Sequence, residues 1–595
     1  MSAANGRPHM RKHSFLASVI LCWCAAGCTA LLDGRMHPTA LPAQAFDEWP
    51  TYGHDYANTR HVELTQIDAR NVASLEPAWR YTLDASGPME SSPVVHDGII
   101  YVTSAERDGV VALDASSGAL RWQFWPKLTR FFVCCSKANR GVAVAGGRAF
   151  VATLDGHLVA LDAVTGKQLW SQAIGDPRAG FSETAAPLAW RDMVTIGSAG
   201  SEFGIRGSYS ALRQSDGKLL WRWWATNPGW EGSYVKRVNG HSLHRDTARE
   251  RANAPRYRDA WRHGGGTVWM TPALDPASAT IYLSTGNPAP DYNGDMRPGD
   301  NLYTDSIVAL DARTGAMRWF YQEVPHDLWD YDAGSPPFLF GALDARGRLV
   351  AAVGEASKTG WLYILDRSTG KVVRISDGIV PQRRIFQTSA GMIEPGGAGG
   401  ALGPSSYDPR RHRAFVVAVE RPEIWEPQPA QPFEPGKEWK AGLVHMTIGA
   451  LNYVDAVDVD TGHVVWRRYL SGARGQHTNV GFISGSLSAG DIVFVAEPTG
   501  ALFALSADTG HVLWHYEIAQ TFKRPAPSWR DRFADFIGGI FGRRAVQVSA
   551  SPTIAHLDAP PIRYVAAGRE YIAVCADVTS DGVERNVVLA FALPR

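Results

Sequence analysis

A short motif recurs seven times along the 595-residue chain, and it limits the possible folds more than any other feature. The copies are Ala112–Gly118, Ala160–Gly166, Ala211–Gly217, Ala309–Gly315, Ile364–Gly370, Ala456–Gly462 and Ala504–Gly510. Tryptophan follows the glycine by four residues in every copy except the fifth, which has Arg374 there. An apolar strand, a turn ending in glycine and a second strand form a β-hairpin, because glycine adopts positive φ without strain.

Further short strands lie between these copies, for example at 98–103, 148–153 and 491–495. About four strands in every 50 residues, repeated along the chain, predict an all-β fold of radially arranged sheets. We expect an eight-bladed β-propeller with W-type tryptophan docking between neighbouring sheets, as one domain over residues 45–595. The eighth blade requires strand 587–591 and an N-terminal strand.

Two long intervals interrupt the repeat. The first carries a polar insertion at 229–263, and the second carries a proline-rich insertion at 420–440. Helices are expected only at 65–75 and 528–541.

The first 28 residues have the pattern of an export signal. Arg11 and Lys12 precede an apolar run at 15–26, which is too short to span a bilayer comfortably. Small residues lead to Cys28 in a sequence similar to a lipobox, so both cleavage and lipidation of Cys28 are open. An early start-codon assignment is the alternative. We expect a periplasmic protein with no membrane span, attached to a membrane only if Cys28 carries a lipid.

Charge and cysteine content exclude some partners. Lys+Arg and Asp+Glu both number 59, which argues against nucleic acid or an anionic membrane as a general partner. Beyond residue 28 the cysteines are Cys134, Cys135 and Cys575. The adjacent pair could close a strained disulfide in an oxidising compartment, or could be two neighbouring buried thiols. The chain lacks the C-x-x-C-H motif that attaches c-type haem.

Three polar segments lie outside the repeated motif. Residues 197–207 form a glycine-rich turn with Glu202, residues 284–290 place Asn287 beside prolines, and residues 326–332 contain three aspartates. Carboxylate and amide oxygens are hard ligands that suit Ca²⁺ or a trivalent ion. Each segment taken alone could equally be a turn whose polar side chain caps its own backbone.

Together with other motifs, these segments resemble the pyrroloquinoline-quinone (PQQ)-dependent methanol and ethanol dehydrogenases. The resemblance runs from residues 49–60 to the C-terminus and includes Cys134–Gly141 and Gly264–Trp269. It implies an eight-bladed propeller that holds PQQ in its axial channel, together with one Ca²⁺ or lanthanide ion. The implied cofactor-binding residues are Glu90, Cys134, Cys135, Arg140, Thr184, Gly200, Ser201, Thr267, Trp269 and Lys358. The implied metal ligands are Glu202, Asn287, Asp330 and Asp332.

In this resemblance, Trp269 stacks under the quinone and a Cys134–Cys135 disulfide covers the other face. Asp330 is the general base for alcohol oxidation to an aldehyde or ketone, with hydride transfer to the quinone. Lys358 places positive charge at the reduced quinone. The electrons pass to an external acceptor such as a soluble cytochrome c. Asp332 resembles the lanthanide-using branch of the family, although a solvated turn residue is the alternative for Asp332.

The chain departs from the family pattern at two places. The turn at 399–409 lacks the usual Asn and Trp, and the late Trp-Gly-Gly is missing, with Phe482 the nearest aromatic residue. These changes concern the substrate cavity, so we expect a substrate other than methanol. Two other classes of protein remain open: a non-catalytic propeller lipoprotein that acts as an outer-membrane assembly scaffold, and a sugar- or polymer-binding module with structural Ca²⁺.

Overall fold

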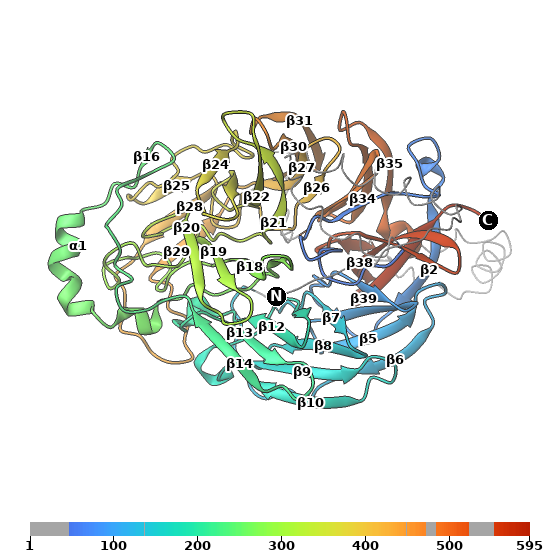
Figure 1. Cartoon of the computed structure of the whole chain (residues 1–595), viewed down its shortest axis with the longest axis horizontal. Helices are drawn as coiled ribbons and strands as arrows, with labels where there is room; N and C mark the ends of the chain where they lie inside the picture. Colours follow the sequence, from blue (N-terminus) through green and yellow to red (C-terminus); the bar gives the residue numbers. More distant parts are fainter. Residues whose placement is uncertain (1–46, 136, 448, 472–483, 523–552) are drawn as a thin grey trace, which may run out of the picture. The chain divides into compact units, whose positions relative to one another are not determined.

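The computed structural model describes residues 47–595, except 136, 448, 472–483 and 523–552 (Figure 1). The predicted signal at 1–28, the predicted helix at 528–541 and Phe482 lie outside the described residues. Residues Gln44–Arg595 form one compact unit.

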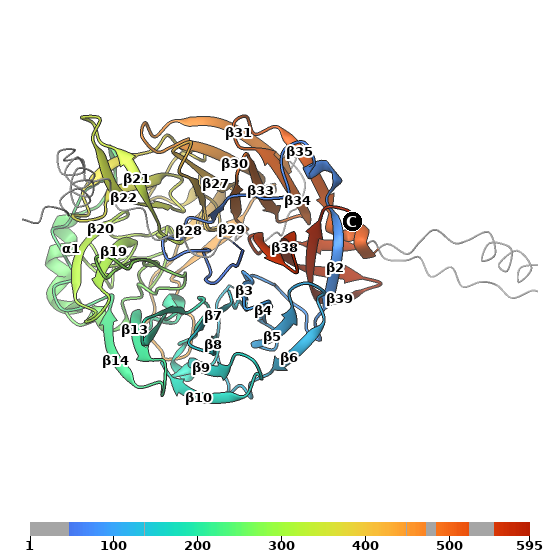
Figure 2. The same ribbon diagram turned by 45° about the vertical axis from the view of Figure 1, so that its right-hand side comes forward.

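The described residues form ten sheets, eight of which have four or five strands arranged around a ring (Figure 2). This is a β-propeller. The first four sheets in the chain are β3 (Val94–His96), β4 (Ile99–Ser104), β5 (Gly109–Asp114), β6 (Leu120–Phe124); β7 (Val142–Ala145), β8 (Arg148–Thr153), β9 (His157–Asp162), β10 (Gln168–Ala173); β11 (Leu188–Trp190), β12 (Met193–Gly197), β13 (Ser208–Arg213), β14 (Leu219–Trp224); and β17 (Ala273–Asp275), β18 (Thr280–Ser284), β19 (Ser306–Asp311), β20 (Met317–Gln322).

The other four large sheets follow in the second half of the chain. They are β21 (Phe338–Leu343), β22 (Leu349–Ala356), β23 (Leu362–Asp366), β24 (Val372–Ile375); β26 (Ser406–Asp408), β27 (Arg413–Glu420), β30 (Leu451–Asp458), β31 (Val464–Ser471); β1 (His61–Val62) with β32 (Ser486–Ala489), β33 (Ile492–Glu497), β34 (Ala501–Ser506), β35 (Val512–Glu517); and β2 (Glu76–Thr82) with β36 (Ile554–His556), β37 (Ile562–Ala566), β38 (Arg569–Ser580), β39 (Val583–Ala592).

Two early strands join sheets built from the last part of the chain. Strand β2 pairs antiparallel with β39, with Trp79 opposite Ala590. Strand β1 pairs parallel with β32, with His61 opposite Ser488. The predicted partnership between an N-terminal strand and the C-terminal strand at 587–591 is therefore present.

Five of the six repeat tryptophans, together with Trp79 of β2, each contact the turn of the repeat that follows. The indole Nε1 donates to a main-chain oxygen in that turn, and an added Cβ on the turn glycine would lie 2.5–2.8 Å from a ring atom. The pairs are Trp79 to Ala115, Trp122 to Ala163, Trp170 to Gln214, Trp221 to Ala312, Trp319 to Arg367 and Trp466 to Ala507. The turn glycines are thus required both for positive φ and for close approach of the ring.

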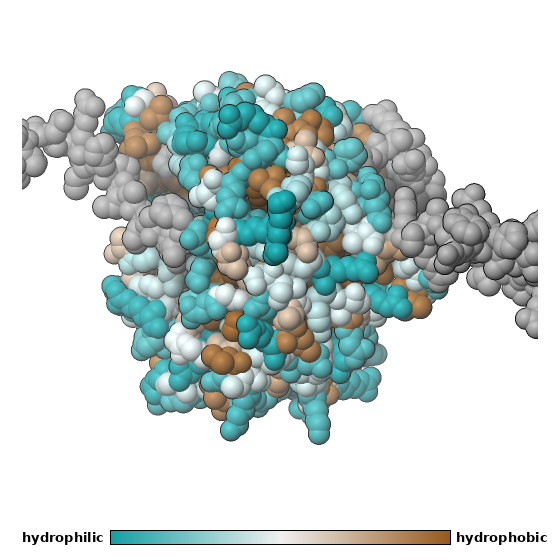
Figure 3. Space-filling view, turned by 90° about the vertical axis from the view of Figure 1, so that its right-hand side faces the viewer, coloured by the Kyte–Doolittle hydropathy of each residue, from teal (hydrophilic) through white to brown (hydrophobic). Residues whose placement is uncertain are grey.

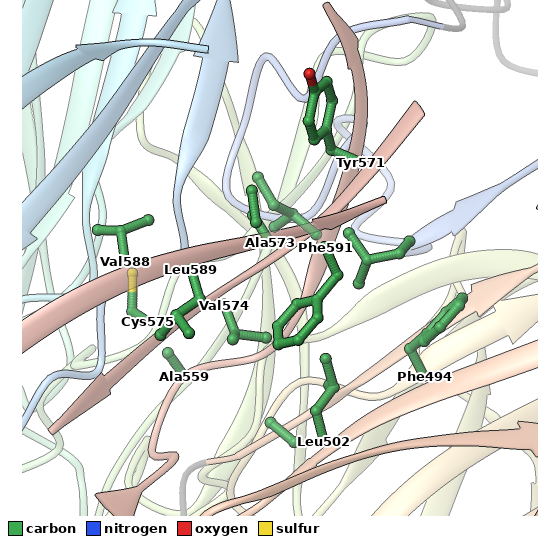
Figure 4. Packing of buried hydrophobic residues seen from close by; sticks show 14 of the residues in the cluster. Phe494, Leu502, Ala559, Tyr571, Ala573, Val574, Cys575, Val588, Leu589 and Phe591 are labelled. Carbon is green, nitrogen blue, oxygen red and sulfur yellow. The ribbon is translucent and has the colours of Figure 1, made fainter. Parts of the chain in front are cut away.

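The core continues across the join between the early and late strands. Val574, Cys575 and Leu589 are fully buried in one apolar cluster with Phe494 and Phe591 (Figure 4). On the face shown in Figure 3, hydrophobic residues are scattered among hydrophilic ones.

Helical structure is sparse. The predicted helix at 65–75 is wrong: that stretch contains only the 3-10 turn η1 (Val72–Ser74), because Asp68 and Asn71 close local side-chain turns. The other helical elements are η2 (Pro177–Ala179), η3 (Ser201–Phe203), α1 (Thr247–Asn253), η4 (Ala254–Tyr257), η5 (Ala260–His263) and η6 (Ile518–Phe522). Among the described residues, no helix is long and apolar enough to cross a membrane.

Both predicted insertions have structure of their own. The first contains the hairpin β15 (Arg237–Val238) and β16 (His241–Ser242), followed by α1, η4 and η5. The second contains β28 (Glu423–Pro427) and is followed by β29 (Gly442–Met446); these two strands form a three-stranded sheet with β25 (Gly391–Ile393).

We predict that Gly166→Ala destabilises the protein more than Gly147→Ala. Both glycines have φ near +70°, so each substitution carries about 1–2 kcal/mol of backbone strain. An added Cβ at Gly166 would also lie 2.5 Å from Trp122, whereas Gly147 has no atom within 4 Å. Overpacking at Gly166 should cost a further ~1–3 kcal/mol. Urea unfolding checks this, and equal midpoint shifts would contradict it.

Candidate active site

The half-buried ring of Trp269 marks one wall of the site. Trp269 follows the turn of Gly265 and Gly266, which both have positive φ, and precedes β17. Its main-chain oxygen accepts hydrogen bonds from Arg140 Nη1 at 3.2 Å and Thr184 Oγ1 at 3.4 Å. The Arg140 guanidinium carbon lies 5.1 Å from the centroid of the indole, within cation–π range.

A buried ion pair lies behind this wall. Arg140 Nη2 is 2.6 Å from Glu90 Oε2, and both side chains are more than nine-tenths buried. Burial raises the pKa of Glu90, and the charge of Arg140 opposes that shift. Among the described residues, Arg140 Nε has no hydrogen-bond partner. A buried guanidinium N–H without an acceptor suits an anionic ligand, such as one bearing carboxylates.

The 3-10 turn η3 positions Ser201 and Glu202. Gly200, which precedes it, has φ of 116°, and an added Cβ would lie 2.1 Å from the oxygen of Gly180, so only glycine fits there. The Ser201 hydroxyl is 3.0 Å from the Thr267 hydroxyl and accepts from the Thr267 N–H at 3.3 Å. The structure therefore brings Gly200, Ser201 and Thr267 together as predicted.

Lys358 lies between two aspartates at the centre of the site. Its Nζ is 2.8 Å from Asp330 Oδ1 and 2.7 Å from Asp332 Oδ2. Burial lowers the pKa of Lys358, but the two carboxylate charges outweigh burial and raise it well above its ordinary value. Burial raises the pKa of Asp330 well above its usual range, while Lys358 opposes that shift. The ammonium is therefore held charged beside a carboxyl group that binds protons readily.

The two aspartates converge although their turn is not extended. Asp330 has φ of 64°, in the left-handed region. Asp332 is only 4% exposed, which excludes the solvated-turn alternative. Its Oδ1 accepts the main-chain N–H of Asn287 at 2.5 Å. A Cβ added to Gly286 would lie 2.7 Å from Asp332 Oδ1 and 3.2 Å from Trp269 Nε1, so these three segments meet.

The cysteine pair lies next to Glu202. Cys134 and Cys135 are free thiols in this structure, and Cys135 Sγ is 3.7 Å from Glu202 Oε1. The hydrogen bond to Cys135 and burial raise the pKa of Cys134 well above its ordinary value. The two sulfurs and a Glu202 oxygen lie within 4.8 Å of one another. The Cys134–Cys135 disulfide stays a prediction. The structure does place both cysteines next to Glu202, a predicted metal ligand.

The predicted metal ligands are only partly gathered. Oxygens of Glu202, Asp330 and Asp332 do not lie within 4.8 Å of one another in this structure, and Lys358 lies between the two aspartates. The Asn287 amide donates to the oxygen of Pro288, which leaves its carbonyl oxygen available.

Asp291 is a carboxylate that the sequence reasoning missed. It is 1% exposed, and Oδ1 has no hydrogen-bond partner among the described residues. Burial raises its pKa well above its usual range, and the charges of Glu202 and Asp330 raise it further. The signal was available in the sequence, because Asp291 directly follows the proline-rich stretch of Asn287. A fourth acidic side chain with an unpartnered oxygen strengthens the fit of this region to a multivalent cation.

The second insertion also reaches the site. The main-chain N–H of Trp439 donates to the oxygen of Glu202 at 2.5 Å. Phe433 stacks on His263 with centroids 3.8 Å apart and lies against Gly204. The insertion therefore covers the turn that carries Glu202.

Exposure divides the predicted residues into two groups. Cys135 is exposed and Cys134, Thr184, Glu202, Trp269 and Asp330 are half-buried, so ligands can reach these six residues. Glu90, Arg140, Ser201, Thr267, Asn287, Asp332 and Lys358 are buried. The arrangement is an accessible wall of aromatic, sulfur and carboxylate groups, supported by buried polar residues.

Comparison with protein families shows where this arrangement belongs. Residues 49–395, more than half of the chain, match the family model of the glucose/ethanol/alcohol dehydrogenase β-propeller domain, named PQQ. The chain belongs to the PQQ-dependent alcohol dehydrogenase family. Residues 447–561 also match a second model, described as outer membrane protein assembly factor BamB.

Individual members of the PQQ-dependent alcohol dehydrogenase family agree with this assignment. The chain is 34% identical to quinohemoprotein alcohol dehydrogenase ADH IIB of Pseudomonas putida over 84% of its own length and 74% of that protein. It is 31% identical to methanol dehydrogenase [cytochrome c] subunit 1 of Methylobacterium organophilum, covering 79% and 80%. A europium-containing methanol dehydrogenase structure is similar with a TM-score of 0.75 and 25% identity, covering 92% of this chain and 99% of that one.

We predict that Lys358→Met destabilises the protein by about 3–5 kcal/mol in chelator-containing buffer, because it leaves the buried carboxylate of Asp332 and the half-buried carboxylate of Asp330 without their cation. Lys358→Arg keeps the positive charge and is the matched control. Urea unfolding of both variants measures the difference. A methionine variant as stable as the arginine variant would show that the ion pair is not a structural requirement.

Proposed function

We propose that this chain is an exported PQQ-dependent dehydrogenase that oxidises an alcohol to an aldehyde or ketone. The observation that carries the proposal is the placement of Asp330, a half-buried carboxyl group on the buried ammonium of Lys358, whose second partner Asp332 meets Trp269 at Gly286. A carboxylate within reach of an alcohol hydroxyl is a suitable base, and a nearby fixed cation favours negative charge. Membership of the family supports the same reaction.

The chain's own residues suggest how it would hold its cofactor and ion. Arg140, Thr184, Ser201 and Thr267 offer donors to a carboxylate-bearing ring, and the face of Trp269 offers a stacking surface. The ion would be held by Glu202, Asn287, Asp330 and Asp332, with Asp291 beside them. When bound, PQQ supplies a two-electron acceptor and Ca²⁺ or a lanthanide supplies Lewis acidity.

Three residues of the chain would then have roles in the reaction. Asp330 accepts the hydroxyl proton of the alcohol while the carbinol hydrogen leaves with its electron pair. Lys358 keeps positive charge next to the reacting atoms throughout. Trp269 provides the apolar surface on which the cofactor ring would lie, and so excludes water from that side. A vicinal Cys134–Cys135 disulfide, if it closes, would form the opposite wall.

The proposal also covers the number of blades, the electron acceptor and the cellular location. The eight large sheets are proposed as eight blades, docked through the repeat tryptophans. The electrons pass to an external acceptor such as a soluble cytochrome c, and the protein works in the periplasm after removal of the export signal, with or without a lipid on Cys28.

The scaffold function is the second candidate, favoured by the match of residues 447–561 to the BamB model. A dye-linked assay across primary and secondary alcohols, with PQQ and either Ca²⁺ or a light lanthanide, separates the two. Dye reduction that requires an alcohol supports the dehydrogenase. Absence of both dye reduction and any change in PQQ absorbance on mixing would support the scaffold.

We predict that Asp330→Asn lowers kcat by about 10²–10⁴-fold, because amide nitrogen and oxygen cannot take the alcohol proton. Asp291→Asn is the matched control: it removes a neighbouring carboxylate, so it should raise the ion concentration needed for activity while leaving kcat at saturating ion within a few fold. Steady-state kinetics and melting temperature are measured for both. Near-normal kcat in Asp330→Asn would refute the base assignment.

We predict that a light lanthanide supports higher activity than Ca²⁺. Glu202, Asp330 and Asp332 together supply three negative charges, which balance a trivalent ion. Apo-protein is loaded with PQQ and either ion, and alcohol oxidation is compared with that of Asp332→Ala. The variant should lose the lanthanide preference. Full activity with Ca²⁺ alone, unchanged in Asp332→Ala, would be the contrary result.

A further inference from the structure

Two segments of the candidate active site meet at one buried guanidinium group. The Asn287 segment (residues 287–291) begins at Asn287 and follows strand β18. The Asp330 segment (residues 326–332) follows strand β20 and contains Asp330. The guanidinium belongs to Arg297, which is fully buried. A buried arginine must find acceptors for its N–H groups within the protein, so its partners show which segments it holds.

Arg297 donates hydrogen bonds to both segments. Its Nε donates to the main-chain oxygen of Pro290 at 2.9 Å, and its Nη2 donates to that of Asp291 at 3.1 Å. The same Nη2 also donates to the main-chain oxygen of Asp327. Nη1 donates to Oδ1 of Asn301 at 2.7 Å, which keeps the plane of the guanidinium in place. Because this group is planar and rigid, its bonds constrain both the distance and the angle between the two segments.

These contacts use main-chain oxygens and leave carboxylate oxygens free for an ion. Among the described residues, Asp291 Oδ1 has no hydrogen-bond partner. A further hydrogen bond between the two segments is of a different kind, because Asp332 Oδ1 accepts the main-chain N–H of Asn287 at 2.5 Å. That contact occupies an oxygen of a predicted ion ligand. The contacts of Arg297 do not compete with an ion in this way, so they persist when the site is filled.

Asp327 extends the constraint from Arg297 to Asp330. Its Oδ1 accepts the main-chain N–H of Trp329 and its Oδ2 accepts that of Tyr331, both at 3.0 Å. Asp330 lies between these two residues. The Trp329 indole and the Tyr331 hydroxyl each donate to a main-chain oxygen in the stretch 387–395 at 2.6 Å. Both neighbours of Asp330 are therefore held at the main chain and at the side chain.

We propose that Arg297 is a positioning residue that sets the gap between the Asn287 segment and the Asp330 segment, and with it the size of the ion that the site accepts. The proposal rests on the proposed function, in which residues of both segments hold the ion. A protein site selects between ions through the size and rigidity of its cavity. With the gap fixed, an ion of the wrong size is coordinated poorly. Without Arg297, the segments can adjust to ions of different size, at the cost of affinity for the preferred one.

Arg297→Lys is the test variant. Lysine keeps the positive charge, but one ammonium cannot reach acceptors in both segments with the geometry of a guanidinium. Arg60→Lys is the matched control, because Arg60 is also fully buried and also donates to three distant parts of the main chain. Its acceptors are the main-chain oxygens of Tyr52, Ser486 and Pro561.

Isothermal titration calorimetry with La³⁺ and with Lu³⁺, the largest and smallest lanthanide ions, measures the gap. Each protein is treated with chelator, loaded with PQQ and freed of unbound PQQ. We expect the wild type to bind one ion at least about ten-fold more tightly than the other. Arg297→Lys should bind the preferred ion about 10–100-fold more weakly and distinguish the two ions by less than about three-fold. Arg60→Lys should keep the wild-type ratio even where its melting temperature falls as far, because general destabilisation lowers both affinities together.

Hydrogen exchange followed by mass spectrometry examines the two segments without an ion or an alcohol. We expect peptides that span 287–301 and 326–332 to exchange about ten-fold faster in Arg297→Lys than in the wild type, and at the wild-type rate in Arg60→Lys. Asn301→Ala is a milder variant, which removes only the acceptor of Nη1 and should change the ion ratio in the same direction.

The outcomes separate this inference from the proposed function. An unchanged ion ratio in Arg297→Lys would overturn the positioning role, as would a wild type that does not distinguish the two ions. A reduced ratio in Arg297→Lys, combined with a wild type that oxidises no alcohol, would keep the positioning role and reject the proposed function.

Discussion

The contact between a tryptophan and the turn of the following repeat, made six times along the chain, is the interaction on which this structure depends. It combines a large apolar surface, one hydrogen bond from the indole and a glycine that leaves room for the ring. Because the contact links one sheet to the next, it fixes the angle between them as well as their separation. The active-site residues come from several sheets, including the segments of Arg140, Ser201, Trp269 and Lys358. The positions of these active-site residues relative to one another therefore depend on the tryptophan–turn contacts, although none of the active-site residues takes part in those contacts.

The sequence predicted this framework well because its signals are local. A turn glycine, a tryptophan four residues later and alternating short strands all lie within about a dozen residues, so spacing alone shows the hairpin. The helix expected at 65–75 shows the limit of such reasoning. Its apolar residues have helical spacing, but Asp68 binds its own turn, and side-chain competition for backbone donors prevails over periodicity.

The candidate site was predicted through resemblance and only partly through residues. Arg140, Thr267 and Trp269 stand in recognisable motifs, and the structure brings them together. The bridging position of Lys358 and the burial of Asp291 could not be read from the chain, because both depend on which distant segments pack against them.

The pairing of β2 with β39 has a consequence for synthesis. Strand β2 is synthesised some five hundred residues before its partner β39, so this sheet cannot form until β39 has left the ribosome. Until then, β2 presents unpaired backbone groups that can pair with another chain. Contacts across some five hundred residues also slow folding relative to local ones. A chain that stops before β39 would leave β2 as an open edge, marking the incomplete molecule for aggregation or degradation.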